Sequence, residues 1–237
     1  MINLLIGGGV GSGKSSTLHT IIAAAAIDKD RPPLVLIDGK GGVELGLWEA
    51  VAHGGVRRTP AEAVTALTWV KGQMDSRYDS MRTLGVRKLG RVHGIPPLLV
   101  GIDELATFTM GGDRKRRETF IGLLHDVASR GRAAAIRIVA TTQKPGTDVV
   151  PSHVRDLFDT RWAFRVSTRD ASDTILGAGM SAAGYSAAKL PAYPGAGLLL
   201  AGGEPPVRTL SHYLGTKDLE RLAAYAAALR NRQIGGS

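Results

Sequence analysis

The fold of this 237-residue chain is decided by one stretch, Gly8-Gly9-Val10-Gly11-Ser12-Gly13-Lys14-Ser15. The stretch fits the pattern G-x-x-x-x-G-K-[ST], a glycine-rich turn whose backbone N–H groups surround phosphate groups. An apolar run at residues 2–6 precedes it, and a helical pattern follows, with one face that carries Leu18, Ile21, Ile22 and Ala25. The order strand, loop, helix therefore predicts that phosphates bind at the positive end of a helix.

The polar residues of this loop indicate a nucleoside triphosphate as the ligand. The Lys14 ammonium is expected to reach the β- and γ-phosphates, and the Ser15 hydroxyl is expected to hold Mg²⁺. A glycine-rich turn that binds nothing is the simpler alternative, but the agreement of strand, motif and helix favours a P-loop NTPase. The expected nucleotide-binding residues are Gly8, Gly9, Val10, Gly11, Ser12, Gly13, Lys14, Ser15 and Ser16.

Apolar strand-like runs alternate with helical patterns along the whole chain. This alternation is typical of an α/β fold, in which helices flank a mostly parallel central sheet. Thr59-Pro60-Ala61-Glu62 predicts a helix start with a capping box, and Thr216 is expected to cap a final helix. The expected strands lie at residues 34–38, 98–104, 136–140, 161–166, 198–200 and 207–210. We expect one domain over residues 1–214, followed by a C-terminal helix and tail over residues 215–237.

The composition constrains the partners of the chain. The formal charge of +9 suggests a polyanionic partner, either nucleic acid or an anionic membrane surface, although a merely solvated basic surface is the alternative. The absence of cysteine excludes disulfides and thiolate metal sites, and it fits a cytoplasmic location. No apolar run reaches the length of a membrane span. The histidines show no ligand spacing, so we expect no metal other than Mg²⁺.

Two acids, Asp103 and Glu104, stand at the tip of an apolar strand. Parallel sheets bind ligands at that end of their strands, so Asp103 is expected to hold Mg²⁺ and Glu104 to polarise the attacking water. A pair of solvated acids is the alternative. Gln143, at the end of a later strand, is a candidate sensor of the γ-phosphate, although a lone glutamine there is usually structural. Asp38 and Lys40 either support the site from behind or form a simple turn.

The segment Arg130-Gly131-Arg132 lies between a helix and a strand and is therefore expected to be exposed. One of its arginines is a candidate for stabilising the transition state on a neighbouring subunit's nucleotide, an effect of roughly 10³–10⁵ in rate. An arginine favoured at a helix C-terminus by the helix dipole is an equally good explanation. These residues alone leave both explanations open.

In this order, the features make the chain similar to the motor domain of the FtsK/SpoIIIE family of DNA translocases. The phosphate loop alone is generic, whereas the ordered set of segments is specific to this family. The resemblance covers residues 4 to about 214. The matching segments lie at residues 8–16, 37–40, 74–78, 85–87, 102–106, 131–134, 140–145, 161–166, 173–177 and 189–191.

The resemblance implies a RecA-like fold and a ring, usually a homo-hexamer, with double-stranded DNA in its pore and ATP between subunits. The residues that it assigns to ATP hydrolysis are Lys14, Glu104, Gln143 and the trans-acting Arg132. The residues that it assigns to Mg²⁺ are Ser15 and Asp103. The positions that match the pore-facing cations of the family are Lys144, Arg155 and Arg169. Such contacts would read DNA phosphates rather than bases.

The chain departs from the family pattern in two respects. Many members have Asp-Pro-Lys where this chain has Asp38-Gly39-Lys40. Typical members also carry an N-terminal membrane region and often a C-terminal winged helix. Neither is found in these 237 residues, so we expect contact with a membrane only through segments outside them.

The sequence therefore predicts an ATP-hydrolysing double-stranded DNA translocase motor that pumps DNA during transfer or segregation. Two other functions stay open: a protein-translocating ATPase related to the motors of type VII secretion, and a non-motor module that binds nucleotide as a switch. The net charge, Lys144, Arg155 and Arg132 argue for DNA over protein as the substrate. Glu104 argues for hydrolysis over a switch.

Overall fold

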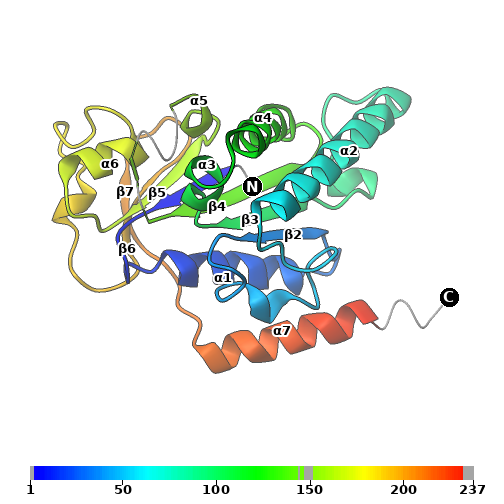
Figure 1. Cartoon of the computed structure of the whole chain (residues 1–237), viewed down its shortest axis with the longest axis horizontal. Helices are drawn as coiled ribbons and strands as arrows, with labels where there is room; N and C mark the ends of the chain where they lie inside the picture. The colour runs from blue at the N-terminus through cyan, green and yellow to red at the C-terminus, as the bar shows by residue number, and fades with distance from the viewer. Residues whose placement is uncertain (1–2, 144, 147–151, 232–237) are drawn as a thin grey trace.

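The computed structural model describes residues 3–143, 145–146 and 152–231. Over these ranges the chain forms a seven-stranded sheet in the order β2-β3-β4-β1-β5-β6-β7 (Figure 1). The parallel strands are β1 (Leu4–Gly7), β2 (Leu34–Asp38), β3 (Leu98–Asp103), β4 (Ile136–Thr142) and β5 (Thr160–Phe164). The antiparallel strands are β6 (Ala196–Leu200) and β7 (Val207–Leu210). The predicted α/β fold with a mostly parallel sheet is confirmed.

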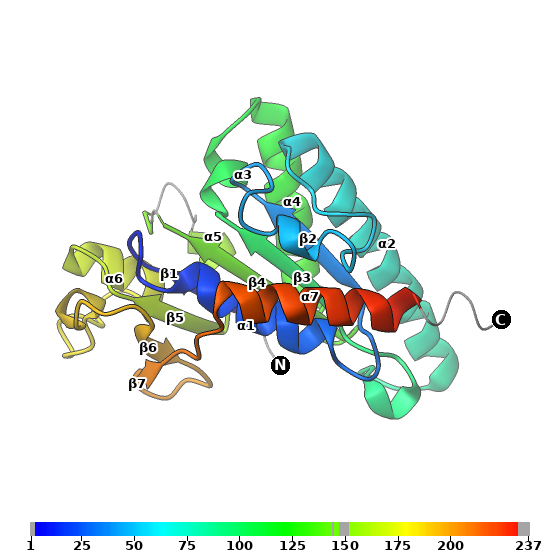
Figure 2. The same cartoon turned by 90° about the horizontal axis from the view of Figure 1, so that it is seen from below.

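Helices cover both faces of this sheet, as Figures 1 and 2 show. The helices of one face are α1 (Lys14–Ala26) and α7 (Thr216–Asn231). Those of the other face are α2 (Pro60–Leu84), α3 (Ala106–Met110), α4 (Arg114–Arg130) and α5 (Ser152–Arg155). Helix α6 (Arg169–Leu176) packs near the end of β5. The short 3₁₀ helices are η1 (Gly46–Trp48), η2 (Arg91–His93) and η3 (Ala187–Lys189).

The helix ends follow from the local sequence. The predicted capping box of α2 is confirmed: Glu62 N donates to Thr59 Oγ1 at 3.3 Å, and Thr59 N donates to Glu62 Oε2 at 3.0 Å. At α4 the Asp113 side chain accepts from two N–H groups of the first turn. The expectation for α7 was wrong by one residue, because Thr216 is the first residue of the helix rather than its cap.

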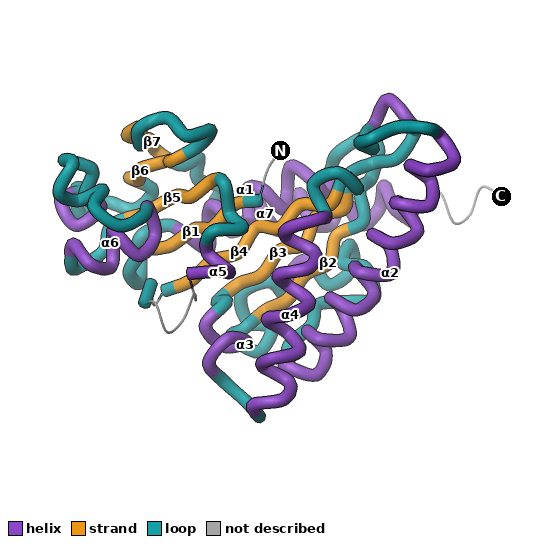
Figure 3. Tube along the Cα trace, turned by 90° about the horizontal axis from the view of Figure 1, so that it is seen from above, coloured by secondary structure: helices purple, strands orange, loops and turns teal. Residues whose placement is uncertain are grey.

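Because β1, β2, β3 and β4 pair in parallel, the loops that follow them, including the phosphate loop, lie at the same edge of the sheet. Gly7 at the end of β1 pairs with Thr142 at the end of β4, and Asp38 at the end of β2 pairs with Asp103 at the end of β3. Figure 3 shows these strands side by side in the tube view. The turns that precede the strands lie at the opposite edge. No helix in the described ranges has both the length and the apolar character needed to cross a bilayer.

Candidate nucleotide-binding site

The phosphate loop is fixed on three sides by backbone hydrogen bonds. Gly8 N donates to Thr142 O at 3.3 Å, Gly9 N donates to Arg165 O at 2.8 Å, and Gly195 N donates to Ser12 O at 2.9 Å. Gly13 has a φ of 105° and lies so close to Gly195 that an added Cβ would be 2.7 Å from the Gly195 nitrogen. A side chain at this position would therefore strain the loop and clash with its support.

Lys14 is buried behind this loop, and its Nζ donates to Gly9 O at 2.6 Å. Burial lowers the pKa of Lys14 to about 8. The hydroxyls of Ser12 and Ser16 are buried, and neither has a hydrogen-bond partner among the described residues. Unsatisfied buried hydroxyls beside a helix N-terminus suit a phosphate ligand, because its oxygens would accept their hydrogen bonds.

The two predicted acids stand at the tip of β3, beside the tip of β4. Asp103 is 1% exposed; its Oδ1 accepts from Thr141 Oγ1 at 2.8 Å, and its Oδ2 lies 2.9 Å from Lys40 Nζ. Burial would lower the pKa of Lys40, but its contacts with Asp103 and Glu44 together outweigh burial and raise this pKa. A cation from the loop after β2 therefore compensates the charge of Asp103.

Glu104 has a φ of 51°, a left-handed conformation that is uncommon for a residue other than glycine. Its carboxylate accepts from Gln143 N at 3.1 Å and from Thr142 Oγ1 at 3.3 Å. The structure thus brings Glu104 and Gln143 together at one corner of the site. The backbone N–H of Gln143 makes this contact, and the side chain of Gln143 is half-buried.

The loop after β2 resolves the question left open for Asp38 and Lys40. The Asp38 side chain is fully buried and accepts from three backbone N–H groups, those of Lys40 at 2.8 Å, Glu44 at 3.0 Å and Leu45 at 2.7 Å. Asp38 therefore holds the turn. The side chain of Lys40 extends from this turn to contact Asp103, and it therefore lies among the residues of the candidate site.

A row of polar side chains in contact, which runs from η1 through His19 of α1 to Glu44, could not be recognised from the sequence. Trp48 Nε1 donates to His19 Nδ1 at 2.9 Å, and His19 Nε2 lies 3.5 Å from Glu44 Oε1. The contact with His19 lowers the pKa of Glu44 to about 2 against the effect of burial, with help from Lys40 and from the hydroxyl of Ser15. The one signal in the sequence is that His19 stands four residues after Ser15 on the same helix face.

Oxygen ligands suited to Mg²⁺ are present in this site. A serine hydroxyl and a carboxylate, with phosphates and water completing the shell, are the set that Mg²⁺ takes beside nucleotides. Ser15 and the buried Asp103 provide such a pair, so the residues fit the ion. The described part of the chain contains no group of three or more His, Cys, Asp or Glu arranged to hold a metal.

The remaining predicted site residues come from other segments of the chain. Arg132 precedes β4 and therefore lies at the opposite sheet edge; its side chain is 61% exposed and contacts Asp159 at 3.1 Å. Arg169 is exposed at the start of α6. Arg155 is only 15% exposed and donates to Thr174 O at 3.4 Å. Lys144 lies outside the described residues.

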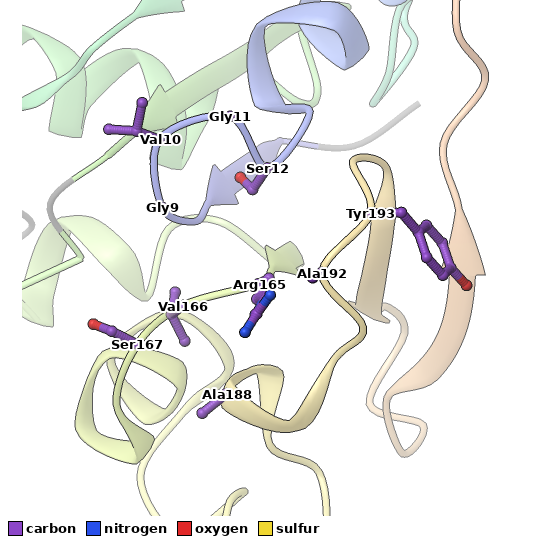
Figure 4. Close-up of a pocket in the computed structure, with 10 residues that line it drawn as sticks. All are labelled: Gly9, Val10, Gly11, Ser12, Arg165, Val166, Ser167, Ala188, Ala192 and Tyr193. Carbon is purple, nitrogen blue, oxygen red and sulfur yellow. The ribbon is translucent and has the colours of Figure 1, made fainter.

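Two hollows flank the phosphate loop. The hollow drawn in Figure 4 has a volume of about 520 Å³, with residues 9–12 on one side and the Arg165 side chain pointing into it. The other has a volume of about 390 Å³ and is lined by Gly13, Ser16, Pro194, Gly195, Ser211 and Tyr213. The segments that line both hollows from the far side follow β5 and β7, and sequence reasoning assigned no site residue to these linings.

Comparison with known proteins decides the family. The model of the FtsK/SpoIIIE family matches residues 1–95. The chain belongs to the FtsK/SpoIIIE family. It is 32% identical over 199 residues to the DNA translocase FtsK of Streptomyces avermitilis, a match over 74% of this chain and 21% of that protein. It is 30% identical over 235 residues to the DNA translocase SftA of Bacillus subtilis, over 93% of this chain and 24% of that protein.

This FtsK/SpoIIIE chain contains the P-loop ATPase domain of the family, and it spans about a quarter of the length of these relatives. Solved structures share its fold. The conjugation coupling protein TcpA of pCW3, solved with ATPγS, superposes with a TM-score of 0.83 at 24% identity, over 97% of this chain and 65% of that one. The type VII secretion ATPase EccC of Thermomonospora curvata superposes with a TM-score of 0.73 at 23% identity, over 95% of this chain and 27% of that one.

Proposed function

We propose that this chain is an ATP-hydrolysing motor domain that translocates double-stranded DNA. The observation that carries the proposal is the convergence of Lys14, Asp103 and Glu104 at one edge of a parallel sheet, in a member of a family whose matched relatives are DNA translocases. Residues 1–214 would form the motor domain, and residues 215–237 a helix and tail appended to it. The domain would act in the cytoplasm, with ATP and Mg²⁺ as its ligands.

The residues of this site would divide the chemistry of hydrolysis among them. Lys14 would exchange its bond to Gly9 O for the β- and γ-phosphate oxygens. Glu104, oriented by the tip of β4, would accept a proton from the water that attacks the γ-phosphorus while the bridging oxygen leaves with ADP. Ser15 and Asp103 would hold Mg²⁺, which when bound neutralises phosphate charge.

Arg132 would act on the nucleotide of a neighbouring subunit. Its place at the sheet edge opposite the phosphate loop keeps it from its own nucleotide and leaves its side chain exposed to a neighbour. A shared site of this kind supports a ring, and the homo-hexamer usual in the family is the assembly that we propose. Gln143, joined to Glu104 at the tip of β4, would sense the γ-phosphate.

The DNA would pass over the cations that follow β4. Arg169 is exposed, and Lys144 stands next to Gln143 in the sequence. Arg155 would have to leave its contact with Thr174 to reach a phosphate. The net charge of +9 supports a polyanionic substrate over a peptide.

The test is the steady-state ATPase rate against protein concentration, with and without linear double-stranded DNA. We expect a rate that rises cooperatively with protein, increases with DNA at low salt, and loses this increase as salt weakens phosphate contacts. Lys14→Ala should abolish hydrolysis. A rate that DNA leaves unchanged at low salt would overturn the proposal, and stimulation by a secretion-signal peptide instead would support a protein-translocating ATPase.

A further inference from the structure

Helix α2 contacts the segment that carries Arg132, which we call the arginine turn and define as residues 130–135. The motif Arg77-Tyr78 stands near the end of this helix, and neither residue belongs to the nucleotide site. Arg77 is half-buried, and Tyr78 packs against the core of the α2 face. The proposed function assigns no task to either residue.

Arg77 holds the C-terminal end of the arginine turn. Its Nη1 donates to Ala134 O at 2.9 Å and to Ala135 O at 3.0 Å, and its Nη2 donates to Pro96 O at 3.0 Å. Ala135 has a φ of 55°, a left-handed conformation that costs an L-residue roughly 1–2 kcal/mol. The guanidinium therefore binds the carbonyls at the point where the backbone of the turn is strained.

Tyr78 holds the other end of the turn. Its hydroxyl donates to Arg130 O at 3.0 Å, and the Arg130 guanidinium lies over its ring, 5.7 Å from the centroid. Arg130 in turn makes two hydrogen bonds with Asp126, at 2.5 and 2.7 Å. Neighbouring residues of one helix thus fix both sides of Arg132.

The Arg132 side chain itself stays accessible. It is 61% exposed, and the ion pair that holds it, with Asp159 at 3.1 Å, is exposed as well. Exposed pairs of this kind contribute little to stability, so Arg132 can exchange Asp159 for a new anion at small cost. A fixed backbone under an exposed guanidinium that can change its partner is the arrangement that a residue acting on another subunit's nucleotide requires.

We propose that Arg77 and Tyr78 are positioning residues that hold the arginine turn, so that Arg132 is presented in register to the neighbouring subunit. This inference rests on the proposed trans-acting role of Arg132. Displacing a catalytic group by about 1 Å costs roughly 10² in rate. The planar fork of arginine binds several carbonyls at once, whereas a lysine ammonium on a flexible stem does not.

The test uses subunit mixing, because it separates the two sites of a subunit. Arg77→Lys should lower kcat about 10²-fold while the affinity for an ATP analogue stays within about twofold of the parent. Mixing Arg77→Lys with Lys14→Ala subunits should restore activity, since some interfaces then combine an intact phosphate loop with an intact arginine turn. Arg82→Lys, an exposed arginine on the same helix, is the matched control and should keep the parental rate.

Two further variants keep the result decisive. Tyr78→Phe removes one hydrogen bond and keeps the ring; it should show a smaller loss of kcat and the same rescue by Lys14→Ala subunits. Arg132→Ala mixed with Lys14→Ala tests the shared site alone. If this pair recovers activity and the Arg77→Lys and Tyr78→Phe mixtures do not, the positioning role is overturned and the proposed function stands. If none of these mixtures recovers ATPase activity, both the proposed shared site and the positioning role are overturned.

Discussion

Lys40 Nζ lies 2.9 Å from Oδ2 of Asp103, a carboxylate that is only 1% exposed. Lys40 comes from the loop after β2 and also lies 3.4 Å from Glu44 Oε2. The carboxylate assigned to Mg²⁺ is therefore already compensated by a protein cation before any ligand binds. A divalent cation at Asp103 would compete with this ammonium. The contact of Lys40 with Asp103 therefore couples the loop after β2 to cation binding at Asp103.

Lys40→Met should destabilise the metal-free protein by roughly 3 kcal/mol, because it leaves a buried carboxylate without its partner. Mg²⁺ should restore more stability to this variant than to the parent, since the ion no longer competes with a lysine. Thermal melts in EDTA and in Mg²⁺ measure both effects. Lys71→Met is the control, because that exposed lysine pairs with Asp75 on the surface of α2 and should change little. Equal Mg²⁺ shifts in Lys40→Met and parent would contradict the prediction.

Glu104→Gln should lower the single-turnover rate of ATP hydrolysis by about 10²–10⁴, because an amide accepts no proton from water. Nucleotide affinity should stay within about twofold, since Glu104 follows β3 and does not belong to the phosphate loop. Filter binding with a non-hydrolysable analogue measures the affinity. Glu118→Gln, on the exposed face of α4, is the matched control. Turnover by Glu104→Gln at the parental rate would instead favour a nucleotide-binding switch.

Local patterns in the sequence predicted the sheet, the phosphate loop, the α2 capping box and the acids at the tip of β3. Each of these depends on residues within a few positions of one another, or on the rule that parallel strands end at a common edge. The position of Arg132 away from the phosphate loop follows from the same rule, because it precedes the strand whose far end carries Gln143.

Contacts between distant segments could not be predicted. Lys40 follows β2 and Asp103 ends β3, with the whole of α2 between them in the chain, and nothing in the pattern at Trp48 indicates a bond to His19. The left-handed backbone at Glu104 depends on the tip of β4 that holds its carboxylate. The partial burial of Arg155 against α6 likewise arises from tertiary packing, which a count of basic residues does not contain.

Gly39→Ala should destabilise the protein by about 1–3 kcal/mol, because the added methyl group would lie 2.7–2.9 Å from Glu104 O, Asp103 O and Thr107 Oγ1. Gly39→Pro should destabilise more, since it also removes the N–H that donates to Asp103 O at 2.9 Å. The proline common at this place in the family thus does not fit the loop seen here. Urea unfolding measures both changes.

The control for these substitutions is Gly72→Ala, in the exposed middle of α2, where the added methyl group would meet nothing within 4 Å beyond the local helix backbone. It should stabilise the protein by about 0.5–1 kcal/mol, since alanine is the better helix former. Parental stability of Gly39→Pro would show that the loop after β2 can adopt another conformation.

Above pH 8, ATP binding should be coupled to the uptake of a proton by Lys14. Burial lowers the pKa of Lys14 to about 8, and phosphates bind its charged form. Affinity should therefore fall as the pH rises through 8. The unfolded chain keeps this proton until about pH 10.4, so the stability of the unliganded protein should rise with pH between these values. Calorimetry at pH 7 and 8.5, in buffers of different ionisation enthalpy, measures the uptake. Adenosine, which lacks phosphates, is the control and should take up none. ATP binding without proton uptake at pH 8.5 would show that Lys14 is fully charged in the free site.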